Sequence, residues 1–228
     1  MSEKLDVYNY KRIKTGKIIE RNENAILDKC DYILAIQCWI INAKCEILLT
    51  RRKLGKVHGG MWEPTGGLVQ SGENSIQATK RELNEEIGIN ISERELKFIK
   101  EKIDKSDRHN VFRDVYVIKK DININELKFN DGEVIESKWI SLDEYVCLYN
   151  KGEIAPSGDF VIKMLKEKLL EDLKDAMKTK NVNKKNAVQM VRTAILQIEK
   201  DKGIEVSDEQ ILGIVAKEVK TRKDAIAE

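Results

Sequence analysis

The sequence predicts an α/β (α+β) sandwich that continues into a small all-α region. Up to about Gly158, short runs rich in β-branched and aromatic residues alternate with helical patterns. After Gly158 the chain has no Pro and only two Gly, and an apolar period of three to four residues runs throughout. No Gly-, Ser- or Pro-rich linker separates the two parts. We therefore expect domains at residues 1–164 and 165–228, which can share one continuous helix.

Strand and helix signals mix irregularly in the first part, which favours a sandwich over a regular βαβ series. Helical signals cover Ser75–Ile87 and a segment after Ser141. The longest apolar run includes Cys38, which we expect to be a buried thiol. The clearest predicted strands are "YILAIQCWII" (32–41), "CEILLTRR" (45–52), "NVFRDVYVIKK" (110–120) and "IESKWISL" (135–142).

Three amphipathic helices are predicted in the second part. The first carries apolar residues spaced by four, from Leu165 to Met177, and the second ends at Gly203. The third opens with Ser207 and has Gln210 three residues later, which is the pattern of a capping box. Short polar turns join them, so a helical hairpin or bundle is expected.

Composition indicates a globular cytoplasmic protein. The formal charge is +2, which gives no overall attraction to nucleic acid or membrane. No run approaches the roughly 20 apolar residues of a membrane span, and the charged first twenty residues do not resemble a signal peptide. The four Cys show no C-x-x-C spacing, from which we infer a reducing compartment.

The helix from Ser75 carries an unusual concentration of acids. Glu82, Glu85 and Glu86 cover an arc of roughly 100° beside the apolar stripe, where like charges three and four apart repel one another. Oxygen ligands gathered without His or Cys suit Mg²⁺ or Mn²⁺. A divalent cation is therefore the expected compensating charge.

The same segment resembles the Nudix box, G-x5-E-x7-R-E-U-x-E-E-x-G-U, where U is aliphatic. The resemblance implies a Nudix α/β/α sandwich with a mixed sheet, and hydrolysis of a diphosphate joined to another moiety. Every fixed position matches: Gly67, Glu73, Arg81, Glu82, Leu83, Glu85, Glu86, Gly88 and Ile89.

The resemblance also implies roles for the box residues. Glu85 and Glu86 correspond to direct metal ligands, and the Gly66 carbonyl is a third candidate. Glu82 corresponds either to a ligand through water or to the general base. The metal would be Mg²⁺ or Mn²⁺, and it would neutralise the diphosphate and acidify water.

Arg81 and Glu73 correspond to an ion pair that holds the acids in place. Nudix proteins often take a further acid from a later loop, for which Glu133 and Glu136 are the candidates; solvated loop acids are the alternative interpretation.

Three residues outside the box are candidates for binding the substrate. Arg51 and Arg52 end a predicted strand and could contact phosphate oxygens. Solvated charges at a strand end are the alternative. Trp62 could line the pocket, or it could be a core aromatic.

A second enzyme class stays open. "KTGKIIER" and "GGMWEPTGG" are similar to Nudix proteins near isopentenyl-diphosphate isomerase. That isomerase has a catalytic Cys and a metal-binding His just before the box helix, whereas this chain has Thr65, Gly66, Gly67 and Leu68 there. Hydrolysis is therefore favoured.

From about Leu165 the chain resembles the GatB/YqeY family, whose relatives in tRNA-dependent amidotransferases contact tRNA. A basic run from Lys178 to Arg192 contains no acid, as phosphate contacts would require, but lysines on solvated helix faces explain it equally well. A tRNA-associated binding protein with a ligand-sensing Nudix domain is thus the alternative to a hydrolase. A homodimer is expected from the resemblance to Nudix proteins, whose domains are often dimers.

Overall fold

The computed structural model describes residues 3–21, 27–105, 110–130 and 132–159, together with Gln189 and Thr193. By compactness the chain divides into two units, Met1–Trp139 and Ile140–Glu228. The three helices expected after Leu165, and the domain boundary expected near residue 165, lie outside the described residues.

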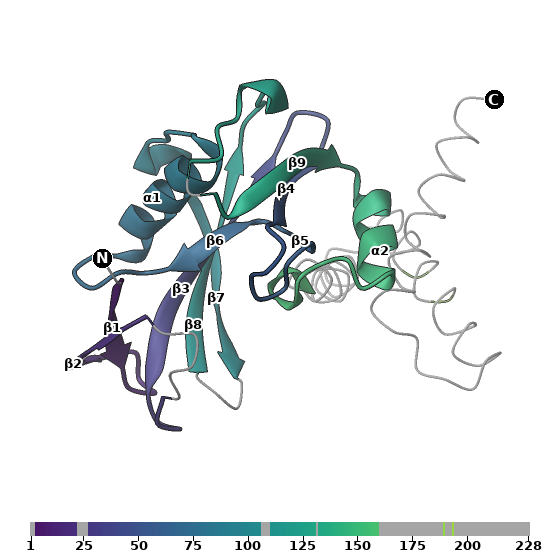
Figure 1. The fold of residues 1–228 in the computed structure, drawn as a ribbon. Helices are drawn as coiled ribbons and strands as arrows, with labels where there is room; N and C mark the ends of the chain where they lie inside the picture. Colours follow the sequence, from purple (N-terminus) through teal and green to yellow (C-terminus); the bar gives the residue numbers. More distant parts are fainter. Residues whose placement is uncertain are drawn as a thin grey trace, which may run out of the picture. The chain divides into compact units, whose positions relative to one another are not determined.

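The described elements mix strands and helices along the chain (Figure 1). The strands are β1 (Lys4–Tyr8), β2 (Lys14–Glu20), β3 (Tyr32–Ile41), β4 (Ile47–Arg52), β5 (Trp62–Glu63), β6 (Thr65–Leu68), β7 (Lys97–Lys105), β8 (Asn110–Lys119) and β9 (Val134–Ile140). The helices are α1 (Ser75–Ile87), α2 (Leu142–Asn150) and the short 3₁₀ turns η1 (Glu93–Glu95), η2 (Ile124–Glu126) and η3 (Pro156–Asp159).

Strand β3 is the centre of the sheet. It pairs in parallel with β8 along its whole length, from Tyr32 opposite Asn110 to Ile41 opposite Lys119. It also pairs antiparallel with β1, β4 and β6. The mixed sheet expected from the sequence is therefore confirmed, with nine strands among the described residues.

Both faces of β3 are buried, as its nearly continuous apolar sequence requires. Side chains at even positions, including Ile36 and Cys38, pack with Leu83 and Ile87 of α1. Odd positions such as Ile33 and Ala35 pack in a second cluster with Leu5 of β1 and Val111 of β8.

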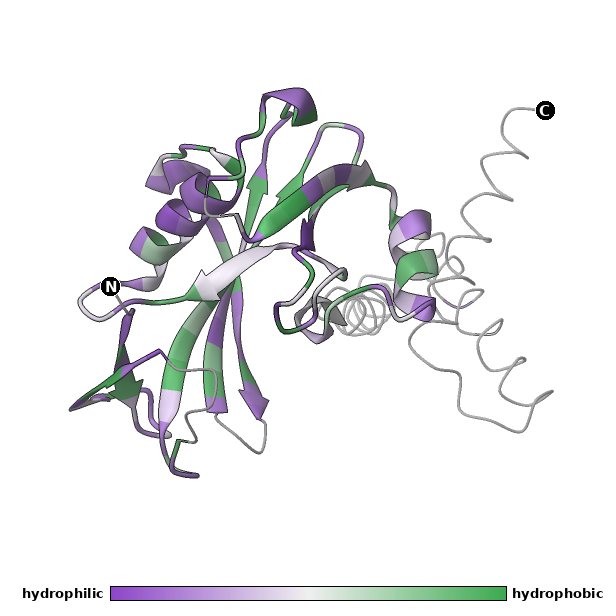
Figure 2. Cartoon of the chain, viewed as in Figure 1, coloured by the Kyte–Doolittle hydropathy of each residue, from purple (hydrophilic) through white to green (hydrophobic). Residues whose placement is uncertain are grey.

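Helix α1 packs in the core through a narrow apolar face. It is mostly hydrophilic in Figure 2, whereas β3 and β8 are largely hydrophobic.

In the described part of the chain, no helix combines the length and apolarity needed to cross a membrane.

The structure has elements that the sequence pattern did not predict. The β1–β2 hairpin and β7 were not expected as strands. Nearly all of β2 is exposed, and β7, "KFIKEKIDK", lies at an edge of the sheet with six charged residues among its nine. Polar edge strands avoid unwanted pairing and give little hydrophobic signal.

Cys38 is fully buried, which confirms the expected buried thiol, and burial raises its pKa to about 12. Because the thiolate is the reactive form, we expect Cys38 to resist a thiol reagent such as Ellman's reagent. Cys30, Cys45 and Cys147 are exposed. The native protein should therefore titrate three thiols at neutral pH and a fourth only after unfolding; four fast thiols in the native state would contradict this burial.

Candidate active site

The site is built on a strand–loop–helix segment. Strand β6 pairs antiparallel with β3, which brings Gly66 and Gly67 opposite Gln37 and Ile36. Helix α1 starts with a capping box, in which the Asn74 side chain accepts from the Gln77 backbone N–H at 2.9 Å, and the Gln77 side chain accepts in return. It ends at Gly88 in the left-handed conformation, with φ of 73°.

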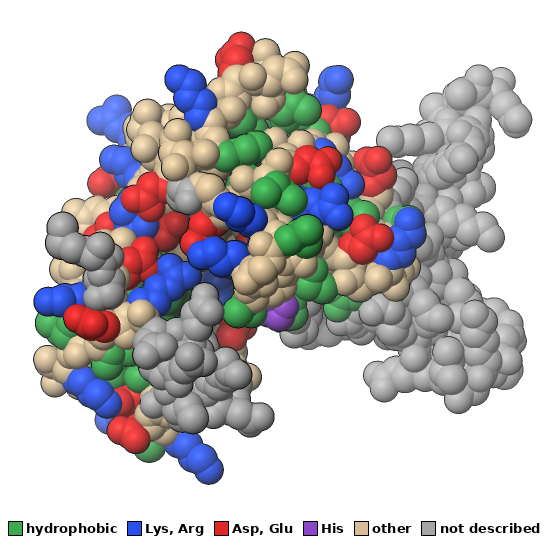
Figure 3. All heavy atoms as spheres, viewed as in Figure 1, with side chains coloured by type: hydrophobic (Ala, Val, Ile, Leu, Met, Phe, Trp, Pro, Cys, Tyr) green, Lys and Arg blue, Asp and Glu red, His purple; other side chains and the backbone are tan. Residues whose placement is uncertain are grey.

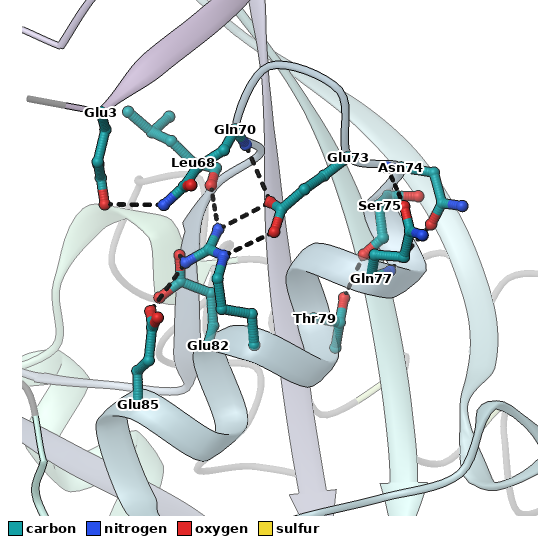
Figure 4. Close-up of polar contacts among 11 residues, drawn as sticks. Glu3, Leu68, Gln70, Glu73, Asn74, Ser75, Gln77, Thr79, Glu82 and Glu85 are labelled. Atoms are coloured by element: carbon teal, nitrogen blue, oxygen red, sulfur yellow. Dashed lines mark hydrogen bonds and ion pairs between the residues drawn. The ribbon is translucent and has the colours of Figure 1, made fainter.

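Arg81 connects the acids of the site (Figure 4). Its Nε and Nη2 donate to the two carboxylate oxygens of Glu73 at 2.8 and 3.1 Å, and Nη2 also donates to the Leu68 carbonyl at 3.0 Å. Its Nη1 donates to Glu82 at 2.8 Å and to Glu85 at 2.9 Å. Although burial alone would lower the Arg81 pKa, these carboxylates raise it, so the guanidinium stays charged.

This arrangement adds to one expectation. The repulsion among the box acids was expected to be relieved by a divalent cation, yet Arg81 already relieves part of it at Glu82 and Glu85. Its spacing of four residues from Glu85 was a visible signal for this ion pair. Among the described residues, no three His, Cys, Asp or Glu side chains stand in a geometry that could hold a metal ion.

The three box acids differ in exposure. The Glu82 side chain is 12% exposed and that of Glu85 is 45% exposed, while Glu86 is buried. Burial raises the pKa of Glu82 to about 7, although the Arg81 charge and hydrogen bond act to lower it. Glu85 is therefore the box acid that can turn most freely.

The two glycines of β6 have different steric roles. A β-carbon at Gly67 would lie 2.1 Å from the Glu82 Oε1, so the Glu82 carboxylate fills the space that glycine leaves. A β-carbon at Gly66 would lie 2.7 Å from the Ile36 carbonyl oxygen, which is backbone of the paired strand. Glycine at position 67 therefore leaves room for the Glu82 carboxylate, whereas glycine at position 66 allows β6 to pair closely with β3.

The two candidate phosphate-binding arginines are held at the end of β4. Arg51 Nε donates to the Gly60 carbonyl at 2.9 Å, and its Nη1 lies 3.2 Å from Glu136. Arg52 Nε donates to the Val57 carbonyl at 2.9 Å, and Nη1 pairs with Glu63. The Arg51 side chain is 42% exposed and the Arg52 side chain 21%, so Arg51 is the more accessible.

Trp62 is buried beneath two cations. Arg51 and Lys138 lie 5.6 and 4.2 Å from the centre of its ring. The structure thus places it in the sheet next to Arg51.

The later loop acid Glu133 lies among basic residues. Its Oε1 accepts from Lys56 at 2.9 Å, and its carbonyl accepts from the Lys53 N–H at 2.8 Å. Burial alone would raise the Glu133 pKa, but Lys56, Arg21 and Arg52 lower it overall. Acidic and basic side chains intermingle at the centre of the face seen in Figure 3.

Sequence reasoning missed the contribution of the N-terminal strand. Glu3 accepts from the Gln70 side chain at 3.3 Å and Asp6 accepts from Ser71 at 2.7 Å, in the loop between β6 and α1. Nothing in the local pattern indicates these contacts, because they join residues 65 or more positions apart.

A carboxylate-rich helix that follows a glycine strand, packed on a mixed sheet, defines the Nudix class of hydrolases. The family comparison gives the same result, since a family model described as NUDIX domain matches residues 31–161. The chain therefore belongs to the Nudix hydrolase family. A second model, described as Yqey-like protein, matches residues 166–228 and confirms the resemblance of the C-terminal part.

Individual proteins similar to this chain include both a Nudix hydrolase and an isomerase. An uncharacterised Nudix hydrolase of Listeria monocytogenes is 30% identical over 68% of this chain and 89% of its own length. An isopentenyl-diphosphate Delta-isomerase of Klebsiella pneumoniae is 31% identical over 48% of this chain and 61% of its own. The solved structure of DR0079 from Deinococcus radiodurans shares the fold, with a TM-score of 0.55 at 22% identity over 69% of this chain and 94% of that one.

The two glycines give a matched pair of variants. Gly67→Ala forces the Glu82 carboxylate away from Arg81, so we expect a folded protein whose rate of diphosphate hydrolysis falls about 100-fold. Gly66→Ala forces apart the backbones of β3 and β6, so we expect a loss of about 1–3 kcal/mol of stability. Urea unfolding and initial rates measure both effects. A fully active Gly67→Ala protein would show that the Glu82 position is unimportant.

Proposed function

We propose that this Nudix family member is a pyrophosphohydrolase that depends on Mg²⁺ or Mn²⁺ and cleaves a diphosphate linked to a nucleoside or another moiety. The observation that carries the proposal is the Arg81 network, which holds Glu82 and Glu85 beside a glycine strand shaped to accept the Glu82 carboxylate. An ordinary exposed helix would need neither the partly buried Arg81 guanidinium nor a glycine next to the Glu82 carboxylate.

The chemistry of the donor set suits a hard divalent cation, although in the described arrangement, where Arg81 holds Glu82 and Glu85, no three acids converge on one point. Glu82, Glu85 and Glu86 supply carboxylate oxygens within five positions, the Gly66 carbonyl lies on the neighbouring strand, and Glu133 is a further acid. Arg81 contributes only one positive charge to this group. When bound, the cation supplies positive charge to the diphosphate and acidifies water.

The residues of the chain have separate tasks in this proposal. Arg81 fixes the orientation of Glu82 and Glu85 through one nitrogen, while Glu73 fixes Arg81 through the other two. Glu82 is the candidate to take the proton from the attacking water, because it is held next to the cation-binding acids.

For substrate binding, Arg51 is favoured over Arg52. Arg51 is the more exposed, and its guanidinium is oriented by Trp62 and the Gly60 carbonyl. Arg52 is engaged by Glu63, so it supports the loop at residues 53–60 and adds to the local positive charge.

Hydrolysis is preferred to isomerisation by the residues before α1. Thr65–Leu68 contains neither the Cys nor the His of the isomerase pattern, and Gly67 leaves room only for Glu82. The test is the formation of hydrolysis products, resolved by chromatography, from nucleoside diphosphate sugars, dinucleoside polyphosphates, nucleoside triphosphates and prenyl diphosphates, with and without Mg²⁺. Turnover of none of them would favour the ligand-sensing alternative.

On the best substrate of that panel, Glu85→Gln and Glu86→Gln should each lower the rate by about 100-fold or more, because each removes a ligand charge. Glu93→Gln, which changes an exposed acid just after α1, is the matched control and should keep the wild-type rate. Unchanged thermal unfolding would show that the loss is not one of folding. Near-wild-type rates in both site variants would refute the metal assignment.

The Yqey-like part carries a second proposal. We infer that residues 166–228 contact tRNA or an RNA-associated protein through the lysines of that segment, which lie outside the described residues. The basic run from Lys178 to Arg192 supports phosphate contacts.

The full chain should therefore retard tRNA in a mobility-shift experiment at low salt, and the shift should weaken steeply as salt rises. Deletion of residues 168–228 should abolish it. A shift that survives the deletion would place the contact in the Nudix domain instead.

A further inference from the structure

We propose that Asp6 is a positioning residue of the active site, through which the β1–β2 hairpin, residues 3–21, holds the loop that precedes α1. The hairpin lies outside residues 31–161, which match the Nudix family model. It fastens the loop at residues 70–73, and that loop holds Glu73 against Arg81. The inference deepens the proposed function, on which it rests.

Both carboxylate oxygens of Asp6 are used to hold the loop. The Ser71 hydroxyl donates to Oδ1 at 2.7 Å, and the Gly72 N–H donates to Oδ2 at 3.2 Å. Lys14 of β2 also donates to Oδ2, at 2.6 Å. The Asp6 side chain is only 14% exposed, and its negative charge strengthens each of these bonds.

Two further contacts from the same strand reach the loop. The Ser71 N–H donates to the Lys4 carbonyl at 2.7 Å, so the backbones are joined as well. The Gln70 side chain donates to Glu3 at 3.3 Å, while Arg21 holds Glu3 from the other side at 2.6 Å. Three consecutive loop residues are thus tied to the hairpin.

The loop passes this constraint directly to the box. The Gln70 N–H donates to Glu73 Oε2 at 3.1 Å, and the Glu73 N–H donates to the Gln70 carbonyl at 3.0 Å. Glu73 then holds Arg81 by two hydrogen bonds. In Figure 4, dashed lines join Gln70 to Glu3 and to Glu73, and Glu73 lies across the guanidinium from the box acids Glu82 and Glu85.

The far end of the hairpin is anchored independently. Arg12, at its turn, adopts φ of 60°, which a non-glycine residue seldom does. Its Nη2 lies 2.6 Å from the buried Asp114 of β8, and Nη1 pairs with Glu101 of β7. Because the hairpin is fixed to the sheet at this end, it can restrain the loop at the other.

The test compares Asp6→Ala, Asp6→Asn and the control Lys17→Ala. Lys17 is on the same hairpin but pairs with Asp31, at 2.7 Å. Amide hydrogen exchange of the metal-free full chain measures how firmly the loop is held. This measurement does not depend on enzymatic activity. We expect exchange at residues 70–73 to quicken about tenfold or more in Asp6→Ala and to stay unchanged in Lys17→Ala.

Turnover and Mn²⁺ binding measure how the Asp6 substitutions affect the active site. We expect Asp6→Ala to lower kcat about tenfold with KM changed less than about twofold, and to weaken Mn²⁺ binding measured by electron paramagnetic resonance. Asp6→Asn keeps an acceptor for the Ser71 hydroxyl and should recover most of the loss. If Asp6→Ala does not fold, Ser71→Ala removes a single bond and should lower kcat about threefold.

Repeating Asp6→Ala in a variant of Glu73 distinguishes a positioning role of Asp6 from a general effect on stability. In Glu73→Ala the connection to Arg81 is already broken, so adding Asp6→Ala should cost little further kcat. An equal loss in both backgrounds, or exchange and kcat like those of Lys17→Ala, would overturn the inference.

Failure of the proposed function would look different. The wild-type chain would then turn over no substrate and bind no Mn²⁺, while the exchange comparison would still decide whether Asp6 holds the loop.

Discussion

The guanidinium of Arg81 is the interaction on which the acidic site depends. Three acids lie on one side of a short helix, and their mutual repulsion would drive them apart if nothing held them. Arg81 offers its flat array of donors to Glu73, Glu82 and Glu85 at once, and its remaining capacity goes to the Leu68 carbonyl. A lysine could neutralise the same charge but could not fix three carboxylates in one plane. A single residue therefore supplies the geometry and part of the charge balance.

That residue is in turn placed by the sheet. Strand β3 is buried on both faces, so its register with β8 and β6 is strongly specified. The pairing with β3 fixes the position of β6, the strand that carries Gly66 and Gly67. Leu83 and Ile87 pack α1 against β3. The acids of α1 and the glycines of β6 therefore meet at one place without any loop having to span a long distance.

The sequence predicted the parts of this arrangement whose signals are local. Helix α1 was recovered with its bounds because its apolar spacing and the glycine that follows it are local signals. Strand β3 was recovered because burial on both faces leaves an unbroken apolar run. The β1–β2 hairpin was missed because an exposed edge strand has no such run, and its contacts to residues 70–72 join distant parts of the chain. The part played by Arg81 was only half recognised. The ion pair with Glu73 was expected from the family pattern, whereas the bonds to Glu82 and Glu85 depend on side-chain conformations that spacing alone does not fix.

The space above Gly67 has a consequence for how this protein can change over evolution. Since the Glu82 carboxylate stands where any other side chain at position 67 would begin, the two positions are not independent. A lineage that acquires a side chain at 67 must relocate or discard the acid at 82, and one that discards the acid is released from the need for glycine. Mutational libraries that vary these positions one at a time would therefore meet a barrier that paired substitutions can cross.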